Sequence, residues 1–251
     1  MNGSDWLPLI ALVLVVSSVL LLVGFAIFRR KRTPVFREIP AFTHLRKAIG
    51  RSVEDGSRLH VSLGYGSLAT PQGATGLAGL SALRRLADLA STSDKAPIAT
   101  SGDPSLALLS QDILQTSYKE ATGGGLPDST NARLTGLTPF SYASGTMAVM
   151  SEEHVSTNLV LGSIGVEAGL LTDMAENQQS FMLAASDSLP AQAVLYASAQ
   201  EPLIGEELFA TAQYIQPSPM HAASLTVQDI LRWILIAGIL LGAFLKMAGL
   251  L

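Results

Sequence analysis

The sequence predicts an α/β protein with a single Rossmann-like, mostly parallel sheet domain, flanked by one transmembrane helix at each end. Two observations predict this arrangement. The two longest apolar runs lie at the two ends of the chain, at residues 6–28 and 230–251. Between them, short apolar runs alternate with longer segments of helical spacing, which is the pattern of repeated βα units. We therefore divide the chain into a transmembrane helix at 6–28, a basic juxtamembrane segment at 29–51, an α/β domain at 52–219 and a second transmembrane helix at 228–251.

The first apolar run has the features of a retained membrane anchor. It contains 23 residues without a charged side chain, which is enough for a helix to cross a bilayer core about 30 Å thick. A cleavable signal peptide places basic residues before its apolar stretch and small residues after it. Here Asp5 is the one charged residue before the run, and Arg29-Arg30-Lys31-Arg32 follows it directly. We interpret the run as an anchor rather than a signal peptide.

The distribution of basic residues predicts the orientation. Residues 29–51 contain eight Lys and Arg against one acid, Glu38. A flank of this composition stays in the cytoplasm, so we expect a cytoplasmic central domain and both termini outside. The second run carries charge at Arg232 and Lys246, and Asp229 lies one helical turn before Arg232, at a spacing that favours an ion pair.

Charge and cysteine content exclude several classes of function for the central domain. Residues 52–226 contain six Lys and Arg but 17 Asp and Glu, a net charge of about −11, so we expect no binding of nucleic acid. The sequence has no cysteine, which rules out disulfides and thiolate metal sites. Its four histidines show no metal-ligand spacing, so we predict no metal site.

Four strands are predicted from alternating or continuous apolar segments. The segment RLHVSL alternates and ends in the turn Gly64-Tyr65-Gly66, and the other segments are short apolar runs. The expected strands lie near 59–63, 97–100, 157–161 and 181–185.

The predicted helices lie between these strands. A leucine at every third position from Leu77 to Leu89 indicates the first helix, and Pro104 occupies an early position of the second. Residues 134–151 are expected to be extended or irregular. The expected helices span 74–90, 104–121, 163–178, 190–199 and 205–215.

A weak internal repeat supports this interpretation. The segment 98–103 (IATSGD) is similar to 183–187 (LAASD), and each opens a helix. Leu63-Gly64 is matched by Leu161-Gly162, and each pair closes a strand. Two βαβα units related in this way form an open, mostly parallel sheet with helices on both faces.

The carboxyl ends of parallel strands are the expected ligand site. Glycines there allow backbone N–H groups to approach a phosphate at a helix N-terminus. However, Gly66 is not followed by a glycine at the Rossmann spacing, and the loops contain no basic residue. Two interpretations stay open, a nucleotide or small-ligand site and plain strand-to-helix turns. The residues placed there are Gly64, Tyr65, Gly66, Ser67, Thr100, Ser101, Asp103, Gly162, Ser163, Ser186 and Asp187.

No motif assigns a catalytic residue or a cofactor. Glu152-Glu153-His154 is the densest titratable cluster, and it fits either acid–base chemistry or a solvated turn. Gly162-Ser163-Ile164-Gly165 lacks the spacing of a nucleophile elbow, and no phosphate-binding P-loop is present. Whether the protein is an enzyme therefore stays open, with the sequence favouring a non-enzyme, and the cofactor is unknown.

Small residues in the terminal helices favour helix–helix contact. Gly238 and Gly242 form a small-xxx-small step, while Ser17, Ser18 and Gly24 give the first helix a face of small residues. These features serve either self-association into a homo-oligomer or packing of the two helices within one chain.

Two stretches of the sequence resemble a family of uncharacterised bacterial membrane proteins. They are Met150–Ser163 and Ala184–Gln200, the latter followed by Glu201–Leu208. The resemblance covers most of residues 35–250. It implies one helix at each end of a cytoplasmic α/β domain and a location in the bacterial inner (cytoplasmic) membrane with two spans, and it implies no activity.

Two hypotheses follow from these features. In the first, the chain is a membrane-anchored structural or assembly protein that self-associates through its α/β domain and its transmembrane helices, with the lipid bilayer as its second partner. In the second, it is a membrane-tethered domain that binds a nucleotide or another small ligand, with or without catalysis.

Overall fold

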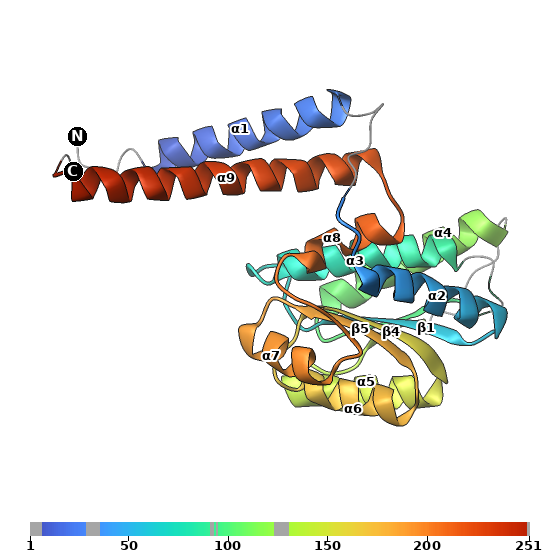
Figure 1. The fold of residues 1–251 in the computed structure, drawn as a ribbon. Helices are drawn as coiled ribbons and strands as arrows, with labels where there is room; N and C mark the ends of the chain where they lie inside the picture. The colour runs from blue at the N-terminus through green and yellow to red at the C-terminus, as the bar shows by residue number, and fades with distance from the viewer. Residues whose placement is uncertain (1–6, 29–35, 91–92, 94, 123–130, 250–251) are drawn as a thin grey trace. The chain divides into compact units, whose positions relative to one another are not determined.

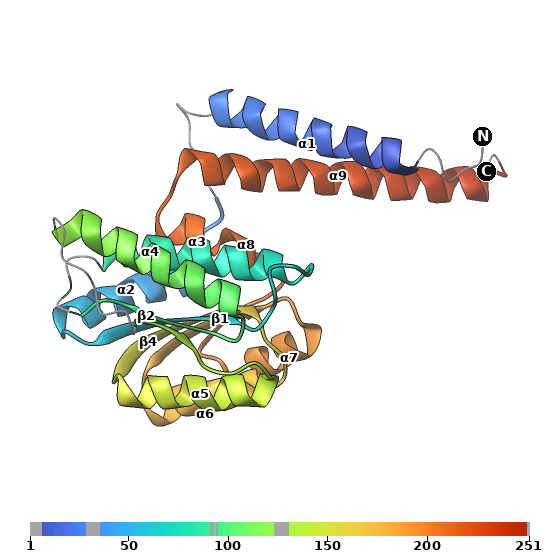
Figure 2. The same cartoon turned by 180° about the vertical axis from the view of Figure 1, so that it is seen from behind.

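The computed structural model describes residues 7–28, 36–90, 93, 95–122 and 131–249 (Figures 1 and 2). The chain forms two compact units, one made of residues up to Arg37 and from Pro217 onward, the other of Glu38–Gln216. The domain expected to begin at residue 52 thus begins as a compact unit at Glu38. Trp6, the basic run 29–32 and Leu251 lie outside the described residues.

The domain contains a six-stranded sheet in which every strand pairing is parallel. The strand order is β3-β2-β1-β4-β5-β6, so the sheet grows outward in both directions from the central pair β1 and β4. This confirms the α/β class and the parallel sheet. The strands are β1 (Arg58–Gly64), β2 (Ile98–Ser101), β3 (Ala132–Leu134), β4 (Val155–Ser163), β5 (Phe181–Ser186) and β6 (Glu201–Leu203).

Four of these strands are the predicted ones, and the two edge strands were not predicted. β3 and β6 have three residues each, too few to show a periodic pattern, and β6 includes Pro202, which edge strands tolerate. The internal repeat falls on corresponding strands. Leu63-Gly64 and Leu161-Gly162 end the central pair, while the segments 98–103 and 183–187 include the ends of β2 and β5.

Helices cover both faces of the sheet (Figures 1 and 2). One face is covered by α2 (Pro40–Glu54), α3 (Gly73–Leu89), α4 (Pro104–Thr122) and α8 (Glu207–Ile215), and the other by α5 (Pro139–Glu152), α6 (Ala168–Asn177) and α7 (Leu189–Ser198). The first of these, α2, lies mostly within the segment expected to be juxtamembrane. Its Phe42, Leu45 and Ile49 are buried in the main core, and the Phe42 ring stacks on Tyr214 with centroids 4.4 Å apart.

The expectation of extended or irregular structure over 134–151 is wrong, because residues 139–152 form α5. The helix begins with a capping box between Thr138 and Ser141, and Pro139 occupies its first turn. Its buried positions include small side chains such as Ala143 and Thr146, which obscure the apolar periodicity in the sequence.

In the terminal unit, α1 (Leu7–Phe28) packs along α9 (Pro219–Met247). Among the described residues, α9 is the one helix long and apolar enough to cross a membrane, and its most apolar stretch is not buried in the structure. The apolar stretch of α1, taken over 11–27, is shorter. The expected pair forms near the start of the apolar stretch of α9, where Arg232 Nη1 lies 3.7 Å from Asp229 Oδ1.

The central strand β1 has one apolar face and one polar face. Leu59, Val61 and Leu63 point into the main core, which α3 covers with its leucines. The residues between them, His60 and Ser62, point to the opposite face, and both are fully buried. A buried polar row thus runs beside α5, where an apolar layer is the usual arrangement.

A directional chain of hydrogen bonds satisfies this row. The Thr100 hydroxyl donates to His60 Nε2 (2.8 Å), and His60 Nδ1–H donates to Asn158 Oδ1 (2.9 Å). Asn158 Nδ2 in turn donates to Ser180 Oγ (2.9 Å), whose hydroxyl donates to the Ala175 carbonyl (3.2 Å). When the imidazole is neutral, both ring nitrogens of His60 have a hydrogen-bond partner. Burial lowers the pKa of His60 from 6.5 to about 4.

This lowered pKa predicts an acid-sensitive domain. The unfolded chain binds a proton at His60 below pH 6.5, whereas the folded domain resists it down to about pH 4. The contribution of neutral His60 to the free energy of unfolding is therefore fully present at pH 7. It falls by up to about 3 kcal/mol as the pH drops from 6.5 to 4.

Urea unfolding of the full chain at pH 7, 5.5 and 4, compared with His60→Gln, measures this contribution. We expect the variant to be less stable at pH 7 and to lose less stability on acidification. The exposed His154→Gln variant is the control, and it should keep the wild-type slope. If the free energy of unfolding fell equally with pH in the wild type and in His60→Gln, His60 would not be the source of the acid sensitivity.

Candidate functional site

The sheet reverses its order at the central pair, and this is where doubly wound folds bind ligands. The chain leaves β1 toward α3 on one face and leaves β4 toward α6 on the other, so the two loops diverge. A pocket of about 610 Å³ opens beside them. Its lining residues, which we call the crevice residues, are Tyr65, Gly66, Ser67, Thr70, Gln72, Ser163, Ile164, Asp187 and Ser188.

Five of the eleven predicted ligand residues line this pocket. They are Tyr65, Gly66, Ser67, Ser163 and Asp187. Each lies at the carboxyl end of β1, β4 or β5 or in the loop that follows it, as expected for a parallel sheet. The structure therefore brings together residues that are more than a hundred positions apart in the chain.

The remaining predicted glycines hold strands together. Gly64 has φ +71°, and a side chain there would collide with the backbone of Ser163. A side chain at Gly162 would collide with the Leu63 carbonyl. These glycines let β1 and β4 approach each other at their ends, and their backbone is not turned toward a ligand.

Three predicted polar residues are occupied by internal hydrogen bonds. Asp103 Oδ1 caps α4 by accepting from Ser105 N (2.9 Å) and Leu106 N (3.1 Å). Ser101 Oγ donates to the Asp103 carbonyl, and the Ser186 hydroxyl donates to the Ile164 carbonyl (2.8 Å). These side chains shape the loops, and none of the three lines the pocket. Thr100 belongs to the buried chain around His60.

Tyr65 connects the loops that follow β1 and β4. Its N–H donates to the Ser163 carbonyl (3.0 Å), and its ring lies edge-on to Tyr142 with centroids 5.9 Å apart. Its hydroxyl hydrogen-bonds Glu167, a buried carboxylate that also accepts from Gly165 N (2.6 Å). Burial, reinforced by the Glu167 charge, raises the pKa of Tyr65 to about 12, so the phenol is a proton donor at neutral pH.

The pocket is suited to hydroxyl-bearing ligands and unsuited to phosphate. No Lys or Arg lines it among the described residues, whereas Asp187 does. The first N–H groups of α6, which would gain most from a phosphate, already donate to the carbonyls of Gly165, Val166 and Glu167, and the Glu167 carboxylate at the N-cap would repel a phosphate. What the described lining offers is serine and threonine hydroxyls, the Gln72 amide and one carboxylate.

Sequence reasoning missed four of the crevice residues: Thr70, Gln72, Ile164 and Ser188. Thr70 and Gln72 belong to a long loop between Gly64 and α3 that folds back over the site, and a side chain at Gly66 would collide with Gln72. Glu167, the carboxylate that bonds the Tyr65 hydroxyl, was not predicted either. Its position at the start of a predicted helix was the available signal.

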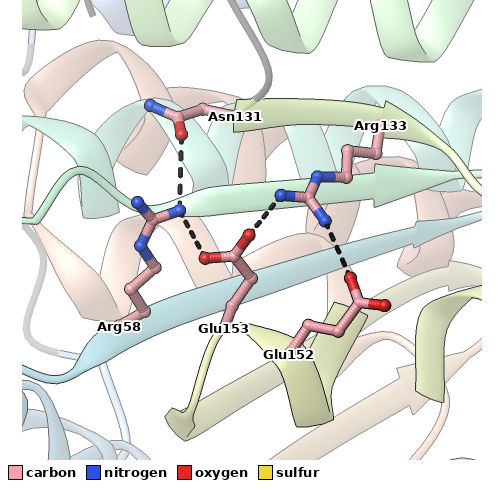
Figure 3. Close-up of polar contacts among 5 residues, drawn as sticks. All are labelled: Arg58, Asn131, Arg133, Glu152 and Glu153. Atoms are coloured by element: carbon pink, nitrogen blue, oxygen red, sulfur yellow. Dashed lines mark hydrogen bonds and ion pairs between the residues drawn. The ribbon is translucent and has the colours of Figure 1, made fainter. Parts of the chain in front are cut away.

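Glu152-Glu153-His154 lies away from this pocket, between the C-terminal end of α5 and the start of β4. Figure 3 shows Glu152 and Glu153 with their arginine partners. Arg58 Nη1 lies 3.0 Å from Glu153 Oε2, and Arg133 pairs with the other oxygen of Glu153. Arg133 also reaches Glu152 at 3.7 Å. Glu153 therefore bridges β1 and β3 as a structural carboxylate. No group of three His, Cys, Asp or Glu in the described part of the chain can hold a metal ion.

Comparison with known proteins places the chain in a family. The model of the family described as Domain of unknown function (DUF6754) matches residues 2–250, and the chain belongs to this family. This agrees with the resemblance to an uncharacterised family. No curated protein and no solved structure matches the sequence.

The bridge at Glu153 predicts unequal effects of two neighbouring substitutions. Glu153 contacts two arginines and its side chain is 20 % exposed, whereas the Glu152 side chain is 69 % exposed and reaches one arginine. Glu153→Gln removes the charge that two partly buried guanidinium groups share, so we expect it to lower the free energy of unfolding by about 1–2 kcal/mol.

Glu152→Gln is the matched control, with an expected effect below about 0.5 kcal/mol because exposed pairs contribute little. Urea unfolding at neutral pH measures both variants. Equal effects would show that Glu153 is not the bridging carboxylate.

Proposed function

We propose that this DUF6754 protein is a membrane-tethered binding domain that holds an uncharged, hydroxyl-bearing small molecule in the crevice at the carboxyl ends of β1, β4 and β5. One observation carries the proposal. At the reversal point of the sheet, the described side chains form a pocket lined by hydroxyls, an amide and a carboxylate, with no cation among them. Sugars and nucleosides present the complementary hydroxyl groups, while phosphate esters meet Asp187 without a balancing charge.

The proposal favours binding over catalysis. Ser67, Ser163 and Ser188 are the serines of the described pocket, and no histidine lines it with them as a base. Tyr65 keeps its proton at neutral pH and directs it to Glu167. Ligand hydroxyls donating to Asp187 and accepting from the serines and the Gln72 amide satisfy these groups without any proton transfer.

The membrane part of the proposal rests on the terminal helices. The length and composition of α9 suit a membrane-spanning helix. The uncharged helix α1 packs along α9 within the same compact unit. The basic segment 29–51 supports a cytoplasmic domain with both termini outside. With the resemblance in sequence, these features support a two-span protein of a bacterial inner membrane.

A second candidate function is self-association through the membrane helices. One observation favours it. A Cβ added at Gly238 or at Gly242 would have no atom within 4 Å, so the contact of α9 with α1 does not occupy these two small positions. The small-xxx-small step is open to a helix of a second copy, and confinement to the membrane plane raises the effective concentration of weak contacts.

Binding in the crevice predicts a preference for uncharged ligands. We expect adenosine or glucose to raise the thermal unfolding midpoint of the full chain in lipid nanodiscs, and the phosphate ester of each to raise it less. Asp187→Asn removes a hydrogen-bond acceptor and a repelling charge. This substitution should therefore weaken the binding of adenosine or glucose about tenfold. It should also reduce the difference in affinity between each compound and its phosphate ester.

Asp112→Asn, at an exposed position on α4, is the control and should bind like the wild type. A phosphate ester that binds more tightly than its parent compound, and whose binding Asp187→Asn alters, would contradict the proposed ligand class. Identical behaviour of Asp187→Asn and Asp112→Asn would contradict the proposed site.

Self-association predicts a change of native mass on substitution in α9. Gly238→Leu with Gly242→Leu keeps the helix apolar but holds a neighbouring backbone away, so we expect the detergent-extracted chain to shift from an oligomeric to a monomeric mass. Ala237→Leu with Ala243→Leu adds comparable volume at exposed positions of the same helix and should leave the mass unchanged. A monomeric wild type would end this candidate function.

A further inference from the structure

A second cavity, distinct from the crevice, lies at the opposite end of the sheet. It has a volume of about 500 Å³ and is bounded by α2 and by the amino ends of β4, β5 and β6. Because the crevice residues follow the carboxyl ends of the strands, no residue lines both cavities. The second cavity is therefore an independent candidate for binding.

Three basic side chains of α2 line this cavity. His44, Lys47 and Arg51 are three and four residues apart, which places them along one face of the helix. His44 Nδ1 is paired with Glu201 Oε1 at 2.5 Å. Neither Lys47 nor Arg51 forms an ion pair with a residue that the structure describes.

The two cations lie at one cavity of an acidic domain. Residues 38–216 contain 9 Lys and Arg but 18 Asp and Glu. Arg58 and Arg133, at another part of the domain, are each paired with a carboxylate. Two cations at one cavity without such a partner leave positive charge available to a ligand.

The rest of the lining is mostly polar and uncharged. Ser52 and Thr157 are buried, and their hydroxyls are bonded within the protein, with Ser52 Oγ 2.6 Å from Ser156 Oγ and 2.8 Å from Thr157 Oγ1. The Gln200 side chain accepts from Met182 N through Oε1, which leaves its NH₂ group as a donor. Gln179 also lines the cavity, and its backbone is held at φ +54°, an uncommon conformation for a residue with a side chain.

Two carboxylates also line this cavity. Glu201 is already paired with His44, and Asp55, the C-cap residue of α2, is the other acid of the lining. Among the described lining residues, the two cations therefore lie beside one carboxylate that is not already held by a side chain of the cavity. Cations combined with an amide donor match the several oxygens of a phosphate group, which accepts hydrogen bonds from many directions.

We infer that the cavity between α2 and the amino ends of β4–β6 binds a phosphate-type oxyanion, through Lys47 and Arg51 at its rim and the NH₂ group of Gln200. The volume admits an organic phosphate as well as the bare ion. The phosphate is carried either by a soluble compound or by an anionic lipid headgroup, and both sources present the same chemistry.

Thermal unfolding of the full chain in nanodiscs tests the inference. In discs of phosphatidylcholine, inorganic phosphate and pyrophosphate are titrated as soluble probes. In a parallel arm without added phosphate, discs containing phosphatidic acid are compared with discs of phosphatidylcholine alone. We expect a saturable rise of the unfolding midpoint in at least one arm.

Paired variants assign the effect to the cavity. Lys47→Gln with Arg51→Gln should weaken the response at least about tenfold, because charged hydrogen bonds are lost. Arg84→Gln with Lys119→Gln removes the same charge from exposed positions of α3 and α4 and should respond like the wild type.

A response to soluble phosphate alone assigns a soluble ligand, and a response to phosphatidic acid alone assigns a lipid headgroup. No saturable response in either arm, or equal losses in the two double variants, would overturn the inference.

Discussion

The pairing of β1 with β4 is the interaction on which the rest of the domain depends. These strands come from opposite halves of the chain, and each half builds outward from its own member of the pair. Their close approach at the carboxyl end requires Gly64 and Gly162, because a side chain at either position would collide with the neighbouring strand. The loops that diverge from this point create the crevice, so the same contact forms the fold and the candidate site.

The polar face of β1 adds a constraint of a different kind. His60 and Ser62 occupy positions where apolar side chains usually pack, and the cost of burying them is met by a chain of hydrogen bonds across three strands. Tyr142 completes the arrangement at the crevice end, where its hydroxyl accepts from Gly64 N at 3.0 Å and pairs with Ser62. Such a network tolerates one register of β1 against β4, because a slip of one residue would exchange the polar and apolar faces.

The two ends of the sheet present different chemistry. At the carboxyl end, hydroxyls and Asp187 line the pocket, and the buried Glu167 carboxylate bonds the Tyr65 hydroxyl. At the amino end, the cations of α2 face a cavity of hydroxyls and amides. The arginines of the Glu153 bridge, at another part of this end, are already occupied by carboxylates and stabilise the strands (Figure 3). The cations that line a cavity thus lie at one end of the strands only, in a domain whose overall composition is acidic.

The sequence by itself determined the α/β class, the four long strands and the placement of half of the crevice residues. These follow from local signals, namely alternation in β1, leucine spacing in α3 and the turns after each strand, and parallel pairing brings such turns together. Tertiary structure alone decided the roles of Asp103, Ser186 and Gly162, since a capping carboxylate, a loop hydroxyl and a packing glycine look like ligand residues until their partners are known. It also decided that α2 belongs to the core and that its cations line a cavity, because a basic amphipathic helix after an apolar run has the same local pattern whether it packs on a sheet or lies free.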